Sequence, residues 1–360
     1  MSVGGVLVGG DAPISVQSMT NTRTEDAAAT LAQIGRLADA GCDIVRVAVP
    51  GKAAAAALRE IVAGSRLPVV ADIHFDHRLA LAAAEAGVHG LRLNPGNIGG
   101  PERVAEVAAA ASARGIPIRI GVNSGSLEKD ILERDGRPTA AGMVESASRH
   151  AEMLEKVGFR DIVLSLKASD VLMGVEANRS MAARCDYPLH LGVTEAGTAA
   201  AGAVRSSVGI GILLAEGIGD TVRVSLAAPP EDEVRVGRLI LSSLGLRRRG
   251  VTVIACPTCG RTEIDVQGIA ERVEAETAAL AADLVVAVMG CSVNGPGEAR
   301  EADVGIAGGG AGVVLFRKGE RVGTIDATLM VERLLAEVRA LATERGGQRP
   351  DPTKPGRRER

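Results

Sequence analysis

The sequence predicts a (β/α)8 barrel of the TIM type, followed by a small α/β domain. Short runs rich in β-branched residues alternate eight times with Ala- and Leu-rich segments of helical length, a pattern typical of parallel α/β folds. Most of the helical segments stop at a glycine, which favours the left-handed conformation of a helix end. An open doubly wound sheet is the alternative, but the number of strands favours a closed barrel.

The barrel is expected to occupy residues 1–245. Its strands are predicted at 14–19, 43–49, 68–75, 90–96, 117–123, 161–167, 188–195 and 221–228. The glycines expected to end the helices between them are Gly41, Gly64, Gly87, Gly115, Gly158, Gly217 and Gly245.

The second domain is expected over residues 246–345. Strands are predicted at 251–257 and 283–290, a helix at 261–276, a Gly-rich hairpin at 304–323 and a final helix near 326–344. The remaining residues, 346–360, are rich in Pro, Gly and charge, which predicts a disordered tail.

Composition argues against several functional classes. The net charge of −3 over 360 residues favours neither nucleic acid nor a membrane surface as a partner. The start, MSVGGVLVGG, lacks the basic and then apolar pattern of a signal peptide, and no apolar run is long enough to span a bilayer. Five cysteines, two of them isolated, do not resemble a secreted disulfide framework. We therefore expect a soluble cytoplasmic protein.

The side chains on the inward-facing positions of the predicted strands are unusually polar. A cation buried without a partner costs several kcal/mol, and the inward carboxylates are few, chiefly Asp72. Each cation could pair with a loop acid or reach solvent at the mouth, but five on one face favour a multiply charged anion such as a diphosphate. These cations are Arg46, Arg92, Arg119, Lys167 and Arg223, and their polar inward neighbours include Gln17, His74, Asn123, His190, Thr194 and Ser225.

Three further barrel residues allow more than one interpretation. His74 and His190 could form a metal pair, although a lone inward histidine is more often a hydrogen-bonding or acid–base residue. Glu195 ends the seventh strand and breaks its alternation. It is either a loop residue on the helix side or a carboxylate turned into the mouth, where catalytic groups of such barrels lie.

Three cysteines of the second domain follow predicted strands, Cys256 and Cys259 in ACPTCGR and Cys291 in MGCSVNGPGE. A redox pair would leave Cys291 unused. A structural zinc site needs a fourth cysteine or a histidine, and the five histidines all precede this domain. An iron–sulfur cluster accepts three thiolates and one other ligand. Glu298, just past a predicted Gly-Pro-Gly turn, is a candidate for that ligand, and its alternative is a solvated loop acid.

The paired motifs CPTCGR and MGCSVNGPGE resemble those of the 4-hydroxy-3-methylbut-2-en-1-yl diphosphate synthase family, of the short bacterial form. Barrel segments resemble the same family in the same order over about residues 3–345. They are VQSMTNT, VRVAVP, ADIHF, LRLNPGNIG, RIGVNSGSL, SLKAS, HLGVTEAG and VRVSLA.

The resemblance implies a [4Fe-4S] cluster held by Cys256, Cys259, Cys291 and Glu298. It implies reductive ring opening and dehydration of 2-C-methyl-D-erythritol 2,4-cyclodiphosphate in isoprenoid biosynthesis, with a flavodoxin or ferredoxin as the electron donor. It also implies a homodimer in which the cluster domain of one subunit closes over the barrel of the other.

For this reaction we expect Arg46, Arg92, Arg119 and Lys167 to hold the diphosphate, assisted by Asn123 and Ser225. The other candidate substrate-binding residues are Gln17, His74, Thr194 and Arg223. Glu195 is the expected proton donor to the departing hydroxyl, Asn294 is expected to hydrogen-bond the same group, and Glu298 is the expected exchangeable ligand.

Two alternatives remain open from the residues. One is a phosphate-binding barrel lyase or aldolase with a structural zinc, in which Lys167 would form a Schiff base. The other is a non-enzymatic iron–sulfur carrier, which would have no use for the inward cations.

Overall fold

The computed structural model describes residues 1–247, 250–278, 280, 282–293, 295–309 and 312–346. The chain divides into two compact units, Met1–Arg247 and Arg248–Arg360. Of the tail predicted over 346–360, all but the first residue lies outside the described residues. Within the described residues, no helix is both long enough and apolar enough to cross a membrane.

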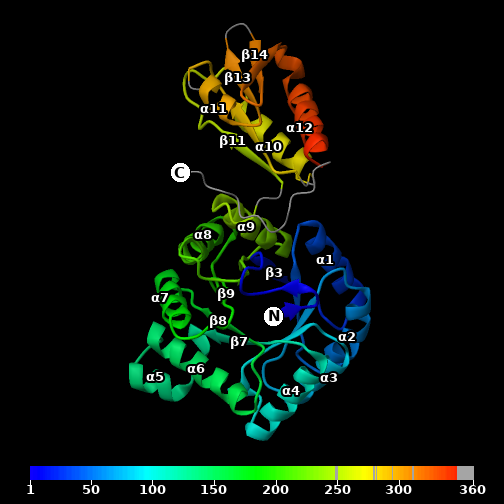
Figure 1. The fold of residues 1–360 in the computed structure, drawn as a ribbon, viewed down its shortest axis with the longest axis vertical. Coiled ribbons are helices and arrows are strands. Elements are labelled where there is room, and N and C mark those ends of the chain that lie inside the picture. Colours follow the sequence, from blue (N-terminus) through cyan, green and yellow to red (C-terminus); the bar gives the residue numbers. More distant parts are fainter. Residues whose placement is uncertain (248–249, 279, 281, 294, 310–311, 347–360) are drawn as a thin grey trace. The chain divides into compact units, whose positions relative to one another are not determined.

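The first unit is a nearly closed barrel of eight parallel strands that follow one another in chain order (Figure 1). Hydrogen-bonded ladders run from the sixth strand back to the first and on to the last two, and a bridge between Leu164 and Leu189 joins the remaining edges. This confirms the predicted fold. The strands are β3 (Ser15–Met19), β4 (Ile44–Ala48), β5 (Val69–Asp72), β6 (Gly90–Leu93), β7 (Ile118–Asn123), β8 (Ile162–Lys167), β9 (His190–Leu191) and β10 (Thr221–Val222).

The last two barrel strands are much shorter than predicted. Just after the end of β9, the backbone of Gly192 approaches its neighbours closely. A Cβ atom at this position would lie 2.5 Å from the carbonyl oxygen of Arg223 and 2.9 Å from Nζ of Lys167. The predicted strand ends at residues 195 and 228 are therefore loops at the mouth of the barrel.

Helices surround the strands (Figure 1). Six of the seven predicted glycines have positive φ angles at helix ends. Gly64 is the exception: it is the last residue of its helix, and Ser65 ends that helix in an extended conformation. The helices are α1 (Ala27–Asp39), α2 (Lys52–Gly64), α3 (His77–Glu85), α4 (Pro101–Arg114), α5 (Lys129–Asp135), α6 (Ala140–Lys156), α7 (Val171–Ala182), α8 (Ala199–Ala215) and α9 (Pro230–Ser243), with short 3-10 turns η1 (Pro95–Asn97) and η2 (Ser124–Ser126).

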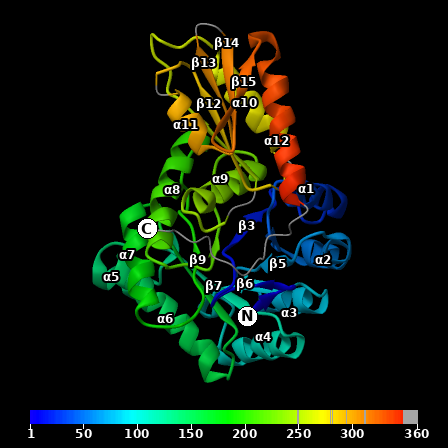
Figure 2. The ribbon, with the colours of Figure 1, turned by 45° about the horizontal axis from the view of Figure 1, so that its top comes forward.

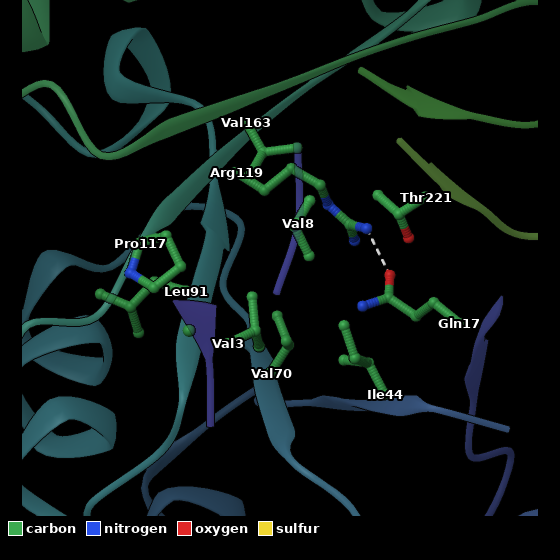
Figure 3. Close-up of a pocket in the computed structure, with 11 residues that line it drawn as sticks. Val3, Val8, Gln17, Ile44, Val70, Leu91, Pro117, Arg119, Val163 and Thr221 are labelled. Atoms are coloured by element: carbon green, nitrogen blue, oxygen red, sulfur yellow. Dashed lines mark hydrogen bonds between the residues drawn. The ribbon is translucent and has the colours of Figure 1, made fainter. Parts of the chain in front are cut away.

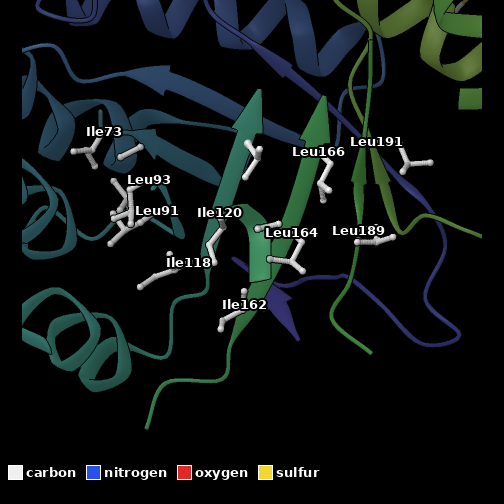
Figure 4. Packing of buried hydrophobic residues seen from close by; sticks show 14 of the residues in the cluster. Ile73, Leu91, Leu93, Ile118, Ile120, Ile162, Leu164, Leu166, Leu189 and Leu191 are labelled. Carbon is white, nitrogen blue, oxygen red and sulfur yellow. The ribbon is translucent and has the colours of Figure 1, made fainter. Parts of the chain in front are cut away.

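The main core lies between the strands and this ring of helices. Ile118 and Ile120 on β7 and Leu164 and Leu166 on β8 are completely buried there (Figure 4). Alternate residues of the same strands consequently point into the barrel, as the period of a strand requires. The cations of interest occupy these inward positions.

A hairpin of β1 (Ser2–Val3) and β2 (Val6–Leu7), which the sequence analysis did not predict, covers the end of the barrel where the strands begin. Val3 and Val8 pack there against Ile44 and Val70. A cavity of about 30 Å³ lies between this hairpin and Arg119 (Figure 3). The hairpin leaves the opposite end, where the strand-end loops gather, as the mouth.

The second unit contains a five-stranded mixed sheet in chain order. Two helices cover one face of the sheet, and a short helix covers the other (Figure 2). The strands are β11 (Val251–Ala255), β12 (Leu284–Met289), β13 (Val304–Gly309), β14 (Gly312–Arg317) and β15 (Glu320–Ile325); α10 (Val266–Thr277) and α12 (Met330–Gly346) lie on the first face, α11 (Gly295–Glu301) lies on the second, and η3 (Ala327–Leu329) precedes α12.

The Gly-Pro-Gly segment is the first turn of α11 and not the tight turn that was predicted. Glycine suits this contact because the helix lies very close to the sheet. A Cβ atom at Gly305 of β13 would be 2.8 Å from the Cβ of Ala299, and one at Gly295 would be 3.0 Å from those of Ala307 and Met289. The small residues of the sheet thus determine where α11 lies.

We predict opposite stability effects from two glycine substitutions in the barrel. Gly115 ends α4 with a φ of 61°, and Gly35 lies within α1; a Cβ atom at either position would contact nothing within 4 Å. Gly115→Ala should lower the free energy of unfolding by about 1 kcal/mol through backbone strain. Gly35→Ala should raise it by about 0.5–1 kcal/mol. Urea denaturation measures both, and a shift of the two variants in the same direction would contradict this assignment.

Candidate active site

The inward cations converge inside the barrel. Arg119 on β7 donates a hydrogen bond to Oε1 of Gln17 on β3, on the far side of the barrel (Figure 3). Arg46, Arg92 and Arg223 all lie close enough to Arg119 to act on its charge. The structure therefore brings together, in one buried interior, positions that the sequence placed on separate strands.

Asp72 neutralises part of this charge. Nη1 of Arg92 lies 3.1 Å from Oδ1 of Asp72, and Nε of Arg46 lies 3.6 Å from Oδ2. Burial alone would raise the pKa of Asp72, but the hydrogen bond from His74 and the charges of Arg46 and Arg92 hold it well below its usual range. The carboxylate consequently stays ionised. Arg92 also donates to the carbonyl of Gly121 at 3.2 Å, where a Cβ atom would lie 2.5 Å from its Nε.

A second buried carboxylate, Glu233 in the first turn of α9, escaped the sequence analysis. It accepts hydrogen bonds from the hydroxyl of Ser18 at 3.0 Å, the backbone N–H of Leu226 at 3.0 Å and Nη2 of Arg223 at 3.2 Å. Acidic residues are common at helix starts, and Glu231 and Asp232 precede it. Nothing in the sequence distinguishes the one that turns inward.

The positive charges of Arg119 and Lys167 are not neutralised in this way. Among the described residues, no carboxylate lies within 4.0 Å of either side chain's nitrogen atoms, and Nη2 of Arg119 is buried without a partner. Burial, followed by the charges of Arg119 and Arg223, lowers the pKa of Lys167 well below its usual value. Burial lowers the pKa of Arg46 to about 10.

The two inward histidines lie in different surroundings. His190 is completely buried, with Nδ1 3.4 Å from the hydroxyl of Thr221 and Nε2 unpaired. Its pKa is well below the usual value because of burial and of the charges of Arg119 and Lys167. The His74 side chain is 59% exposed, and its Nε2 lies 3.7 Å from Asp72. In the described part of the chain, no group of three or more His, Cys, Asp or Glu is arranged to hold a single metal ion.

The loop after β9 is tied to the strand ends on both sides. The N–H of Thr194 donates to the carbonyl of Ala168, which follows β8, at 3.2 Å, and Thr198 forms a bridge with Ala227, which follows β10. Glu195 is exposed within this loop, with a φ of 53°. A left-handed non-glycine residue costs energy, and such residues cluster at functional sites.

Asn123 and Ser225 lie at or beyond strand ends of the same mouth. Asn123 ends β7 and is paired in register with Lys167, the last residue of β8. Ser225 precedes Leu226, whose N–H is held by Glu233. Both side chains are partly exposed, and so they are available to a ligand in the mouth.

The three clustered cysteines all lie beyond the carboxyl ends of strands in the second unit, two after β11 and one after β12. Cys256 comes directly after β11, and its Sγ accepts a hydrogen bond from the N–H of Gly290 at 3.2 Å. Gly290 directly precedes Cys291. The hydrogen bond to Cys259 and the nearby Cys291 raise the pKa of Arg261. Its backbone N–H, and then its guanidinium, lower the pKa of the exposed Cys259 thiol.

Glu298 lies in the first turn of α11, on the face of the sheet opposite α10 and α12. The helix packs on Ala287 and Met289 of β12 and on Ala307 of β13. Asn294, the other predicted residue of this motif, lies outside the described residues.

The thiols of these three cysteines, with the hydrogen-bond donors around them, suit an iron–sulfur cluster. Thiolates are its usual ligands, and hydrogen bonds to the sulfurs tune it. The N–H of Gly290 and the side chain of Arg261 supply such donors. A cluster distributes its ligands over several iron atoms, so its thiolates are spaced more widely than those around a single zinc ion.

His190 predicts a pH dependence of barrel stability. Below pH 6.5 the unfolded histidine gains a proton that the folded one does not, so the free energy of unfolding should fall as the pH falls. One such proton corresponds to about 1.4 kcal/mol per pH unit. Urea denaturation between pH 8 and pH 5.5 should show a steeper loss for the unmodified protein than for His190→Gln, and equal slopes would contradict the neutral state of this histidine.

Comparison with known proteins gives the family. A model of the GcpE TIM-barrel domain matches residues 1–238, and one of the GcpE protein C-terminal domain matches residues 252–340. A 4-hydroxy-3-methylbut-2-en-1-yl diphosphate synthase (flavodoxin) from Geobacter sulfurreducens is 59% identical over 343 residues, which cover 95% of this chain and 97% of that protein. The enzyme of the same name from Ruminiclostridium cellulolyticum is 55% identical over 338 residues, covering 94% and 96%.

Among solved structures, a dihydropteroate synthase from Yersinia pestis aligns with 68% of this chain and 96% of its own, at 14% identity and a TM-score of 0.49. Both units of the chain, and nearly the whole length of its relatives, are covered by the sequence matches. On these grounds the chain is a member of the GcpE family.

Proposed function

We propose that the chain is a 4-hydroxy-3-methylbut-2-en-1-yl diphosphate synthase. It opens the ring of 2-C-methyl-D-erythritol 2,4-cyclodiphosphate with two electrons, loses one oxygen as water and yields (E)-4-hydroxy-3-methylbut-2-enyl diphosphate. The observation that carries this proposal is the set of buried cations in the barrel, only partly neutralised by Asp72 and Glu233. Membership in the GcpE family supports the same reaction.

The barrel interior binds the diphosphate in this proposal. Arg46, Arg92, Arg119 and Lys167 supply positive charge, and a guanidinium can donate two parallel hydrogen bonds to phosphate oxygens. The unpaired Nη2 of Arg119 supports this role, because a buried donor without a partner is costly unless a ligand satisfies it.

The remaining mouth residues complete the proposed site. Asn123 and Ser225 assist from the ends of neighbouring strands, where both are partly exposed. Gln17 fixes the guanidinium of Arg119, and Arg223 is held by Glu233. His74 and Thr194 line the exposed rim. The barrel can thus orient a small anionic ligand and exclude water from its phosphate end.

We propose that Cys256, Cys259, Cys291 and Glu298 hold a [4Fe-4S] cluster, which when bound supplies electrons one at a time. Three thiolates and one carboxylate match a cluster with one ligand that exchanges more readily than sulfur. The chain's own contribution is to stabilise the thiolate form, through the N–H of Gly290 on Cys256 and through Arg261 on Cys259.

Glu195 is the proposed proton donor to the departing hydroxyl group. It is exposed in a loop that two neighbouring strand ends hold in place, and its left-handed backbone is the kind of strain found at functional sites. A carboxylic acid within hydrogen-bond reach can protonate a leaving group as the bond breaks. Asn294 is proposed to hydrogen-bond the same hydroxyl.

The proposed partners follow from the chemistry. Flavodoxin, or else ferredoxin, delivers the electrons singly, in agreement with the names of the relatives. We further propose a homodimer in which one subunit's second unit serves the partner's barrel, and a cytoplasmic location, where reduced thiols persist.

Metal analysis of the purified protein tests the proposed cluster. After anaerobic purification we expect about four irons and four sulfides per chain, with a visible absorption band that stands out because the chain contains no Trp and one Tyr. Cys256→Ser should lose this band. Zinc without sulfide would contradict the proposal and would favour a structural zinc site beside a barrel lyase.

Glu195→Gln tests the proton donor. Glutamine keeps the length of the side chain and has the same difficulty with a φ of 53°, so the fold should be unaffected. With reduced flavodoxin, kcat should fall by about 10²–10⁴-fold, the usual contribution of general acid catalysis. The dissociation constant of the substrate, measured by calorimetry, should stay the same. Full turnover by the variant would exclude this role for Glu195.

A further inference from the structure

The proposed reaction increases the negative charge of the ligand. A cyclic diphosphate has one ionised oxygen on each phosphorus, and so carries two negative charges. When the carbon–oxygen bond to one phosphate breaks, that phosphate becomes terminal, and its second ionisation lies near pH 6. The substrate dianion, two electrons from the flavodoxin-type donor and one proton therefore give the linear trianion and one water, which carries away the hydroxyl oxygen.

The charges of the barrel can be compared with these two ligands. Five basic side chains face the interior, and among the described residues Asp72 and Glu233 are the carboxylates within 4.0 Å of them. When a bound anion keeps Lys167 protonated, three positive charges are thus left without a partner. Asp72 is shared by Arg46 and Arg92, which leaves one, and Arg119 and Lys167 supply the other two. The interior exceeds the charge of the cyclic ligand and equals that of the opened one.

Lys167 differs from the other two unpaired charges. Lys167 is only 7% exposed. The charged groups that lower its pKa are all basic: Arg119, Arg223, Arg46 and Arg92. A guanidinium keeps its proton in proteins, whereas an ammonium buried among cations gives its proton up readily. Lys167 is therefore the basic group of this interior whose charge depends most on an added anion.

We propose that the barrel matches the charge of the ring-opened diphosphate and that Lys167 makes it bind this ligand more tightly than the cyclic one. The inference rests on the proposed function and specifies it further. As the carbon–oxygen bond breaks, negative charge develops on the phosphate oxygen, and the ammonium of Lys167, which the bound anion keeps protonated, can stabilise it. An interaction that is stronger in the transition state than in the ground state accelerates the reaction.

Calorimetry on the cluster-loaded full-length protein tests this inference. Without an electron donor there is no turnover, so the cyclic substrate and the linear diphosphate product can be titrated separately at pH 8. We expect the product to bind at least about tenfold more tightly than the substrate. In Lys167→Met, which keeps the side-chain volume and removes the charge, product affinity should fall more than substrate affinity, and the ratio should approach one. The control is Lys129→Met, at an exposed position on α5, which should keep the ratio of the unmodified protein.

Three outcomes would contradict the inference. Equal affinities in the unmodified protein would mean that the barrel does not distinguish the ligands by charge. An unchanged ratio in Lys167→Met would assign the preference to another residue. If neither ligand bound, the proposed diphosphate site itself would be wrong, which separates the failure of the inference from the failure of the function.

Discussion

The burial of positive charge inside the barrel is the constraint on which the rest of the first unit depends. A cation removed from water is tolerated when a carboxylate of the protein or a bound anionic ligand pairs with it. Asp72 and Glu233 supply part of that pairing, and each of them ties together groups from different elements. The interior without its ligand is therefore less stable than an apolar barrel core of the same size would be. Stability of this kind is commonly given up where binding requires it.

Much of the fold was predictable because its physical causes are local. Strand alternation and helix-ending glycines depend on a few neighbouring residues, and the barrel and the inward positions of Arg46, Arg92 and Arg119 follow from them. The strands after Pro188 and Asp220 were overestimated, because the point where their pairing with neighbouring strands stops is a tertiary effect. The N-terminal hairpin was missed for a related reason, since its valines gain stability only by covering the barrel.

The candidate site divides in the same way. Side chains on strands could be assigned to the interior from their period, whereas Glu233 reaches it from a helix whose acidic first turn has an ordinary explanation. The motif around Cys291 indicated candidate ligands in the sequence. Its Gly-Pro-Gly segment, however, permits both a turn and a helix start. Only packing against the small residues of β12 and β13 decides between them.

That packing has a consequence for how the second unit tolerates change. The helix α11 meets the sheet at Gly295 and Gly305, where an added Cβ atom would lie 3.0 Å and 2.8 Å from the nearest atoms, and Cys256 packs against the same apolar cluster. A larger residue at Gly305 would press on Ala299, the neighbour of Glu298 in α11, and so would shift the helix that carries this carboxylate. Sequence drift at this buried glycine would therefore change the position of a side chain that the glycine does not itself touch.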